Sequence, residues 1–152
     1  MNAKPSPLDR LLAEHRRIAL DSNALIYLID ERGPRGDVVA AIIDACATRT
    51  VEGVLSTVAI TEVLTGPARS RDGAAFERMT DTLRELPLRW VPPSVDIAED
   101  AAWIRGSGRV EIADALHVAT ARAAGATVFV TNDRDIPALP QLEVVYLDDL
   151  VA

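Results

Sequence analysis

The sequence contains a single cysteine, Cys46, so no pair of thiols in the chain can form an internal disulfide. Only two histidines accompany that cysteine, and a structural zinc site is therefore not expected. No apolar run approaches the length that crosses a bilayer, and the start MNAKPSPLDRLL lacks the pattern of a signal peptide. We therefore expect a cytoplasmic protein with no membrane segment, whose fold depends on a hydrophobic core.

Basic residues are outnumbered by acidic ones, and the chain carries a net charge of −7. A nucleic-acid partner usually meets a basic surface, so this balance argues against such a partner. The objection weakens if several acids gather around divalent cations, because each bound ion returns two positive charges. The charge alone therefore does not decide between a nucleic-acid partner and another one.

The chain has 152 residues, of which 49% are hydrophobic and 26% charged, as is typical of one soluble globular domain. Short apolar runs predict strands at 18–20, 53–56, 88–91, 127–131 and 143–147. Helical patterns about ten residues long separate most of these runs. This alternation predicts an α/β fold with a mostly parallel sheet of about five strands, covered by helices on both faces.

The signals for helix starts and stops place a helix before the first strand and helices between the others. The predicted helices begin at Pro7 and cover 24–30, 38–48, 58–65, 74–86, 95–104 and 112–123. Side-chain caps are expected from Ser6, from Ser22 or Asn23, from Thr57 and from Ser94. Gly66-Pro67 is expected to end the helix at 58–65.

The helix predicted at 112–123 is almost wholly apolar, yet Asp114 stands near its start. A carboxylate near a helix N-terminus is favoured by the helix dipole, which is one structural explanation. Glu111, Asp114, His117 and Thr120 also recur every third residue, as they would on a narrow solvated stripe. A single acid on a helix is therefore weak evidence of function.

Three further acids fall at the carboxyl ends of the predicted strands, where open parallel sheets bind ligands. Asp21 ends the first strand, Glu62 lies roughly one turn into the helix after the second, and Asp133 follows the fourth. Structural alternatives exist, because Asp21 can cap a helix and Asp133 can shape a turn. Glu62 is not the partner of a capping box, since Ala59 stands three positions earlier.

These four acids can all reach the same edge of the sheet. Clustered carboxylates repel one another, and a hard divalent cation such as Mg²⁺ or Mn²⁺ is the ordinary remedy. Such an ion lowers the pKa of a bound water and stabilises charge on a phosphoryl oxygen. The pattern therefore predicts metal-dependent hydrolysis of a phosphodiester.

The segments LDSNALIYLID, STVAITEVLTGP, ADALHVATA and VTNDRDI resemble the four acidic motifs of PIN-domain ribonucleases. The likeness is closest to VapC-type toxins of bacterial toxin–antitoxin pairs, and it runs in order over about residues 18–150. It implies a PIN-like three-layer α/β/α sandwich for residues 18–152, with residues 1–17 as an additional N-terminal helical extension. It also implies a homodimer that binds a cognate antitoxin.

The same resemblance assigns roles to individual residues. It implies that the metal-binding and catalytic acids are Asp21, Glu62, Asp114 and Asp133. Supporting positions that hold these acids or the neighbouring turn are Asn23, Thr131 and Asn132, and Asp135 can share or replace the role of Asp133. His117 either touches RNA or a carboxylate, or is structural. The arginines considered for RNA binding are Arg69, Arg71, Arg105 and Arg109.

The leading hypothesis is an Mg²⁺- or Mn²⁺-dependent endoribonuclease that acts as the toxin of a toxin–antitoxin pair. One alternative is a PIN-fold RNA-processing nuclease that is not a toxin. Another is a non-catalytic module that binds protein or RNA, although such a module has no use for four mutually repelling acids. A phosphatase with an aspartyl intermediate is disfavoured, because Asn23 stands where such enzymes carry a second Asp.

Overall fold

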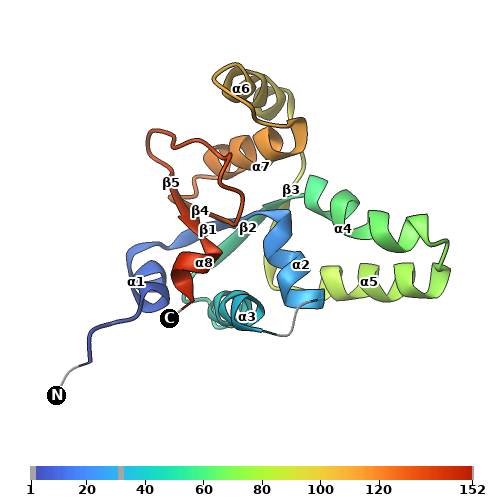
Figure 1. Ribbon diagram of the computed structural model, residues 1–152, viewed down its shortest axis with the longest axis horizontal. Helices are drawn as coiled ribbons and strands as arrows, with labels where there is room; N and C mark the ends of the chain where they lie inside the picture. Colours follow the sequence, from blue (N-terminus) through green and yellow to red (C-terminus); the bar gives the residue numbers. More distant parts are fainter. Residues whose placement is uncertain (1–2, 31–32, 152) are drawn as a thin grey trace.

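The computed structural model describes residues 3–30 and 33–151, which contain one sheet of five parallel strands (Figure 1). The strands are β1 (Arg17–Leu20), β2 (Glu52–Ser56), β3 (Leu88–Val91), β4 (Val128–Thr131) and β5 (Glu143–Tyr146). Their order across the sheet is β3-β2-β1-β4-β5, and every neighbouring pair is parallel. The predicted parallel sheet is confirmed, and β1 lies at its centre.

Helices cover both faces of this sheet, as predicted. In the described chain they are α1 (Pro7–Glu14), α2 (Ser22–Asp30), α3 (Pro34–Ala47), α4 (Val58–Arg69), α5 (Gly73–Glu85), α6 (Val95–Arg105), α7 (Ile112–Ala123) and α8 (Leu147–Leu150). Helices α6 and α7 lie on one face, and α1, α3 and α8 lie on the other (Figure 1). The α/β/α layers of the expected sandwich are therefore present. No helix among the described residues is long and apolar enough to cross a membrane.

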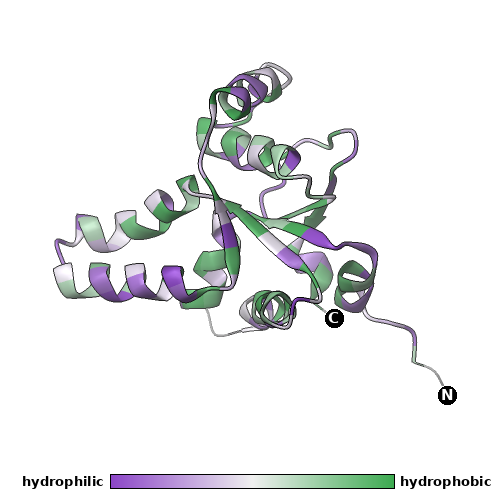
Figure 2. Ribbon diagram, turned by 180° about the vertical axis from the view of Figure 1, so that it is seen from behind, coloured by the Kyte–Doolittle hydropathy of each residue, from purple (hydrophilic) through white to green (hydrophobic). Residues whose placement is uncertain are grey.

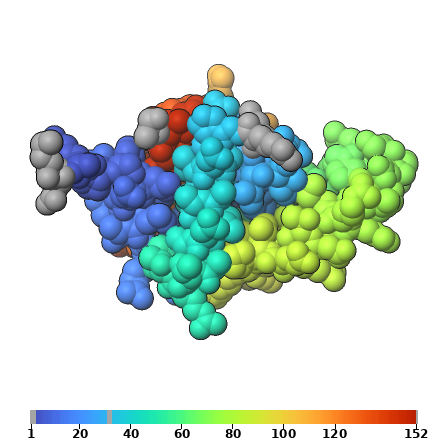
Figure 3. All heavy atoms as spheres, turned by 90° about the horizontal axis from the view of Figure 1, so that it is seen from below, coloured from blue at the N-terminus to red at the C-terminus, as the bar shows by residue number. Residues whose placement is uncertain are grey.

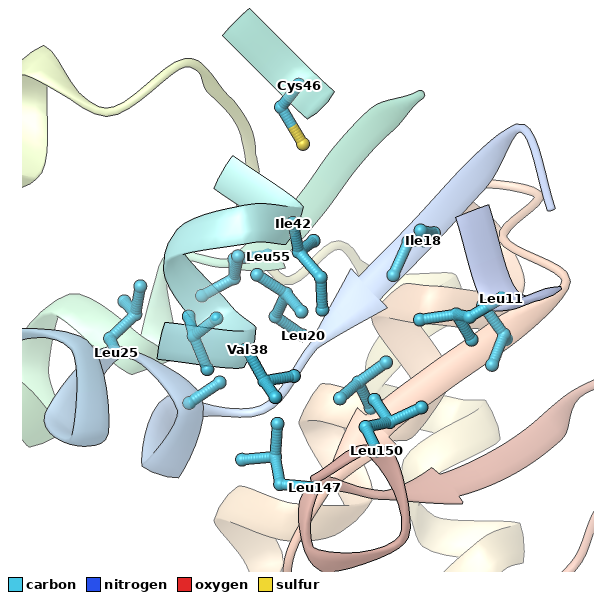
Figure 4. Packing of buried hydrophobic residues seen from close by; sticks show 14 of the residues in the cluster. Leu11, Ile18, Leu20, Leu25, Val38, Ile42, Cys46, Leu55, Leu147 and Leu150 are labelled. Carbon is cyan, nitrogen blue, oxygen red and sulfur yellow. The ribbon is translucent and has the colours of Figure 1, made fainter. Parts of the chain in front are cut away.

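The central strand is buried on both faces because its side chains alternate between two hydrophobic clusters. Ile18 and Leu20 pack with side chains from α1, α2, α3 and α8, as Figure 4 shows. Ala19 points the other way and packs with Phe129 of β4 and with the apolar sides of α6 and α7. Because β1 is packed on both faces, the backbone of the residue that follows it, Asp21, is held firmly in position.

Helix α1 covers part of the core rather than standing apart from it. Ser6 caps it in a reciprocal capping box, in which the Asp9 amide donates to Ser6 Oγ and the Ser6 amide donates to Asp9 Oδ2. Leu11 is buried, and the helix contacts α3 and α8. His15 then hydrogen-bonds Thr127 Oγ1 at 2.7 Å and Glu143 Oε2 at 2.9 Å, which ties the end of the helix to the sheet.

Helices α4 and α5 form a hairpin that projects from the sheet (Figures 1 and 3). Polar residues recur along α5, and apolar residues alternate with them (Figure 2). Between the two helices and β3 lies a cavity of about 420 Å³, lined by Ile60, Leu64, Phe76, Thr80, Leu83, Arg84 and Trp90. The hairpin therefore leaves a mainly apolar hollow beside β3, the edge strand of the sheet.

Three expectations about helix ends are wrong. Helix α2 begins at Ser22, so the position before it is Asp21 rather than Ser22 or Asn23. Thr57 makes no side-chain cap. Instead, the hydroxyl of Ser56, the last residue of β2, accepts the Val58 amide at 3.2 Å.

Helix α4 also continues through Gly66-Pro67 to Arg69. A proline in the last turn removes only one helical hydrogen bond, and the Ser70 amide still donates to the Gly66 carbonyl at 3.2 Å. The short α8 was not predicted. It has only four residues and is held by burial of Leu147 and Leu150.

Candidate metal site at the carboxyl edge of the sheet

Asp21 follows the central strand directly, and only 2% of its surface is exposed. The Ser22 amide donates to Asp21 Oδ1 at 2.7 Å, and the Thr131 hydroxyl donates to Oδ2 at 2.7 Å. The Asn23 amide nitrogen donates to the same Oδ2 at 3.4 Å. Burial raises the pKa of the Asp21 carboxyl above its ordinary value, while the charge of His117 and the hydrogen bonds from Thr131 and Ser22 oppose the rise. The carboxyl group is therefore fixed in direction from several sides.

The Thr131 hydroxyl at the end of β4 connects several of these groups. Its oxygen donates to Asp21, accepts the Asp133 amide at 3.0 Å and accepts the Asn23 side-chain amide at 3.4 Å. Thr131 has no exposed surface, so water does not compete for these bonds. One hydroxyl thus joins the central acid, the start of α2 and the turn after β4.

His117 lies one turn after Asp114 on α7 and is 2% exposed. Its Nε2 hydrogen-bonds Glu62 Oε1 of α4 and lies 4.0 Å from Asp21 Oδ1. Burial lowers the pKa of His117, but the hydrogen bond to Glu62 and the charges of Asp21, Glu62 and Asp114 outweigh burial, so the net shift is upward. The sequence left open whether His117 touches RNA or a carboxylate or is structural, and the structure shows that it contacts the Glu62 carboxylate.

The every-third-residue pattern of α7 is not a solvated stripe. Thr120 is 1% exposed and donates its hydroxyl to the Leu116 carbonyl. Protein covers this face, because His117 bonds Glu62 of α4 and lies near Asp21, which directly follows β1. Of these four polar residues, only Glu111, which precedes the first turn of the helix, is exposed.

Asp114 and Asp133 face each other and share a side-chain hydrogen bond. Burial, then the negative charges of Asp21 and Asp133, and then that hydrogen bond raise the pKa of Asp114 to about 7. The Asp114 carboxyl therefore keeps a proton more readily than an ordinary aspartate does. The structure thus brings Asp21, Glu62, Asp114 and Asp133 together at one edge of the sheet, each from a different segment of the chain.

The other residues singled out in the sequence lie differently. Asn132 directs its amide nitrogen to the Tyr27 hydroxyl and to Asp148 Oδ2, each at 3.4 Å, which stabilises the contact with α8. The Asp135 carboxyl is exposed, and only its backbone amide touches Asp133, at 2.9 Å from Oδ1. Asp133, not Asp135, therefore lies against Asp114.

The four arginines do not touch the acids in the part of the chain that the structure describes. Arg105 Nε donates to the Val110 carbonyl at 3.0 Å and so closes the loop between α6 and α7. Arg109 is exposed on that same loop. Arg69 and Arg71 stand at the end of α4, at the tip of the projecting hairpin.

Two serines position the acids, although from the sequence Ser22 was expected only as a helix cap and Ser56 was not singled out. Ser22 supplies the amide that bonds Asp21, and Ser56 caps α4, the helix that carries Glu62. Both serines sit at the carboxyl end of a strand, immediately before or within the first turn of the next helix. That position is a signal for Ser56, whose hydroxyl accepts the Val58 amide. Ser22 instead donates its own backbone amide to Asp21, which its residue type does not reveal.

The donor chemistry of the cluster fits a hard divalent cation. Carboxylate oxygens are the ligands that Mg²⁺ and Mn²⁺ prefer, and a cation would relieve the crowding of negative charge around Asp114. Over residues 3–30 and 33–151, no three His, Cys, Asp or Glu side chains already converge as a ligand set. Glu62 is bonded to His117 and Asp114 to Asp133, so a cation has to compete with both hydrogen bonds.

Comparison with known proteins identifies the family of the chain. The sequence matches the PIN domain over residues 18–142, and the chain belongs to the PIN domain family, a family of nucleases. Comparison with curated protein sequences gave no match.

Several solved structures share the fold. VapBC2 from Rickettsia felis bound to a promoter DNA fragment aligns with a TM-score of 0.67 at 16% identity, covering 86% of this chain and 98% of the other. FitAcB from Neisseria gonorrhoeae aligns at 0.66 and 21% identity with the same coverage. A toxin–antitoxin complex from Klebsiella pneumoniae aligns at 0.62 and 21% identity, covering 82% and 94%.

Proposed function

We propose that this protein is a metal-dependent endoribonuclease and the toxin of a toxin–antitoxin pair. The observation that carries the proposal is the meeting of four acids from four segments, Asp21, Glu62, Asp114 and Asp133, at one sheet edge. Membership of the PIN domain family supports nuclease chemistry. The cofactor of the proposed reaction is Mg²⁺ or Mn²⁺, and the substrate is RNA.

The residues of the site have different tasks in this proposal. Asp21 is the fixed ligand, because Ser22, Asn23 and Thr131 hold its two oxygens in place. Asp114, Asp133 and Glu62 would complete the ligand set, which would require Asp114 to be deprotonated and Glu62 to release the His117 imidazole. A bound divalent ion supplies an activated water and stabilises negative charge on the phosphoryl group.

His117 is a positioning residue in this proposal rather than an RNA ligand. It is buried beneath the acids, and its imidazole contacts Glu62 and lies near Asp21. A positive imidazole there offsets part of the repulsion among the carboxylates. A group so buried has no route to a nucleic-acid chain.

A non-catalytic binding module on the same fold is the weaker alternative. The raised pKa of Asp114 results first from burial and then from the charges of Asp21 and Asp133, so the ionised cluster is unfavourable in the folded chain. Binding alone does not need this unfavourable charge cluster, whereas a metal-dependent nuclease does. An RNA-processing nuclease that is not a toxin uses the same site and differs only in its partner.

We further propose that the partner is a cognate antitoxin. The solved structures that share this fold include toxin–antitoxin complexes, although the similarity in sequence is low. The apolar cavity of the α4–α5 hairpin, with Phe76 at 37% exposure, offers an unfilled surface for an antitoxin segment.

A homodimer belongs to the same proposal. Helix α6 exposes Val95 (74%) and Trp103 (82%), and Ile112 at the start of α7 is 61% exposed. Large apolar side chains with this much exposure are uncommon on a surface that meets only water. A second copy of the chain would cover them.

RNA cleavage by purified protein with Mg²⁺, with Mn²⁺ and with a chelator tests the proposed activity. We expect cleavage only with metal, and a loss of about a hundredfold or more in Asp21→Asn, Glu62→Gln and Asp114→Asn. Asp81→Asn on the exposed side of α5 removes the same charge elsewhere and should cleave normally. A variant that keeps near-normal cleavage removes its acid from the site, and full activity in the chelator refutes the metal mechanism.

A further inference from the structure

A second cleft lies at the opposite edge of the sheet, where the parallel strands begin. Its volume is about 750 Å³, within the range of small-molecule sites. Its charged lining comprises four arginines and two glutamates: Arg16, Arg17, Arg49, Arg89, Glu14 and Glu52. Asp21 follows the other end of β1, so this cleft is separate from the acidic site.

Two of the arginines are held in place by one glutamate between them. Glu52 accepts from Arg17 Nη2 at 3.2 Å through Oε2 and from Arg89 Nη1 at 3.3 Å through Oε1. Arg17 Nη1 also donates to the Ala124 carbonyl at 2.9 Å, while its Nε is buried with no hydrogen-bond partner. The two guanidinium groups are therefore kept side by side at the cleft.

A glycine leaves the room that this arrangement needs. Gly125, which lines the cleft, has a φ of +75°, and a Cβ at this position would stand 2.9 Å from Arg17 Nη1. Any other residue would be strained by that φ and would push the guanidinium away. The position of the Arg17 guanidinium therefore depends on the absence of a side chain at Gly125.

The other two arginines of the cleft, Arg16 and Arg49, are not paired with an acidic side chain of the described chain. The side chains of Arg16 and Arg49 make no hydrogen bond or ion pair within residues 3–30 and 33–151. Since the lining carries four positive groups against two negative ones, the cleft keeps an excess of positive charge. That excess occurs in a chain whose net charge is −7.

We propose that this arginine-lined cleft binds a phosphate group, carried either by a free nucleotide or by an RNA strand. Guanidinium groups bind phosphate oxygens through paired hydrogen bonds, and several of them around one hollow favour a compact anion. The positions of Arg16 and Arg49 allow contact with the ligand, while Arg17 and Arg89 supply fixed charge. The inference does not depend on the activity proposed for the acidic site.

Arg49→Gly is a sharp test because it removes a guanidinium without harming the backbone. Arg49 has a φ of +61°, in the left-handed region that glycine adopts freely and arginine does not. The variant should therefore fold at least as well as the original, as thermal unfolding will verify. Arg16→Ala serves as a second variant, and Arg78→Ala on the exposed side of α5 is the control of equal charge.

Calorimetric titrations with inorganic phosphate, adenosine monophosphate and a short single-stranded RNA, in chelator and at fixed ionic strength, provide the measurement. We expect saturable binding that weakens about tenfold or more in Arg49→Gly and Arg16→Ala and is unchanged in Arg78→Ala. Tighter binding of the nucleotide than of phosphate identifies a nucleotide site, and binding of RNA alone identifies a strand.

Two results overturn the proposal: absence of saturable binding by all three probes, or equal binding by Arg49→Gly and Arg78→Ala. Because the titrations contain no divalent metal, a failure of the proposed nuclease activity does not alter either result. The two proposals can therefore fail separately.

Discussion

Asp114→Asn is expected to stabilise the metal-free protein, and more so at higher pH. The pKa of Asp114 is raised from 3.8 to about 7 in the folded chain. A carboxyl with a raised folded pKa loses stability as the pH climbs from its unfolded to its folded value, because folding then has to retain a proton or bury a charge. Asparagine carries no charge and removes this loss.

The size of the effect follows from the same pKa. A rise from 3.8 to about 7 corresponds to about 4 kcal/mol for a group fully shielded from water. Asp114 is partly exposed, and solvent screening reduces the expected gain to about 1–2 kcal/mol. For a chain of this length, such a gain raises the melting temperature by about 2–8 °C.

Thermal unfolding of the original protein and of Asp114→Asn, at pH 5 and pH 8 in chelator and at fixed ionic strength, is the assay. The gain should be larger at pH 8 than at pH 5, and Asp81→Asn on α5 should show no such difference. Equal stability of the two proteins at both pH values would refute the idea that burial and the neighbouring acids disfavour the Asp114 charge.

Addition of Mn²⁺ extends the same experiment to the proposed metal site. The original protein should gain about 2.7 kcal/mol at a concentration one hundred times the dissociation constant, because the unfolded chain has no assembled site. Asp114→Asn should lose most of that gain. Equal shifts in the two proteins would instead assign Asp114 to the helix dipole, whose contribution is about 0.3–1 kcal/mol.

Three further outcomes are expected. Production of this protein alone should arrest the growth of its host, and co-production of the antitoxin should restore growth; normal growth with abundant folded protein argues against a toxin. Gly53→Ala should destabilise the fold by about 1–3 kcal/mol in chemical denaturation, because the new Cβ would stand 2.6 Å from Leu88 Cδ2 and 2.8 Å from Cys46 Sγ. Trp103→Glu should convert the proposed dimer to a monomer in sedimentation, whereas Phe76→Glu on α5 should not; a dimer that survives Trp103→Glu excludes α6 from the interface.

The acids that follow strands could be predicted from the sequence, while their hydrogen bonds could not. Asp21 and Asp133 come directly or nearly directly after apolar runs, and parallel strands bring such positions to one edge. The bond between His117 and Glu62 joins residues 55 positions apart. It depends on how α7 meets α4, and no local pattern contains that information.

Local patterns along the helices show a related limit. The spacing of Glu111, Asp114, His117 and Thr120 is typical of a solvated face. Yet His117 and Thr120 are buried, and His117 meets Glu62 of α4 and lies near Asp21 after β1. Pro67 is a strong local stop signal, but near a helix end the lost hydrogen bond is too small a penalty to decide the boundary. In both cases tertiary contacts override a correct local preference.

The hydrogen bond from Thr131 to Asp21 spans 110 positions of the chain, which has a consequence for synthesis on the ribosome. Chains emerge from the N-terminus, so β1, β2 and β3 are available long before β4. Until β4 emerges, one long edge of β1 has no partner, the Asp21 carboxyl lacks its threonine donor, and Asp133 has not been made. A chain that ends before β4 therefore cannot assemble the acidic cluster, and under the proposed function it should lack nuclease activity.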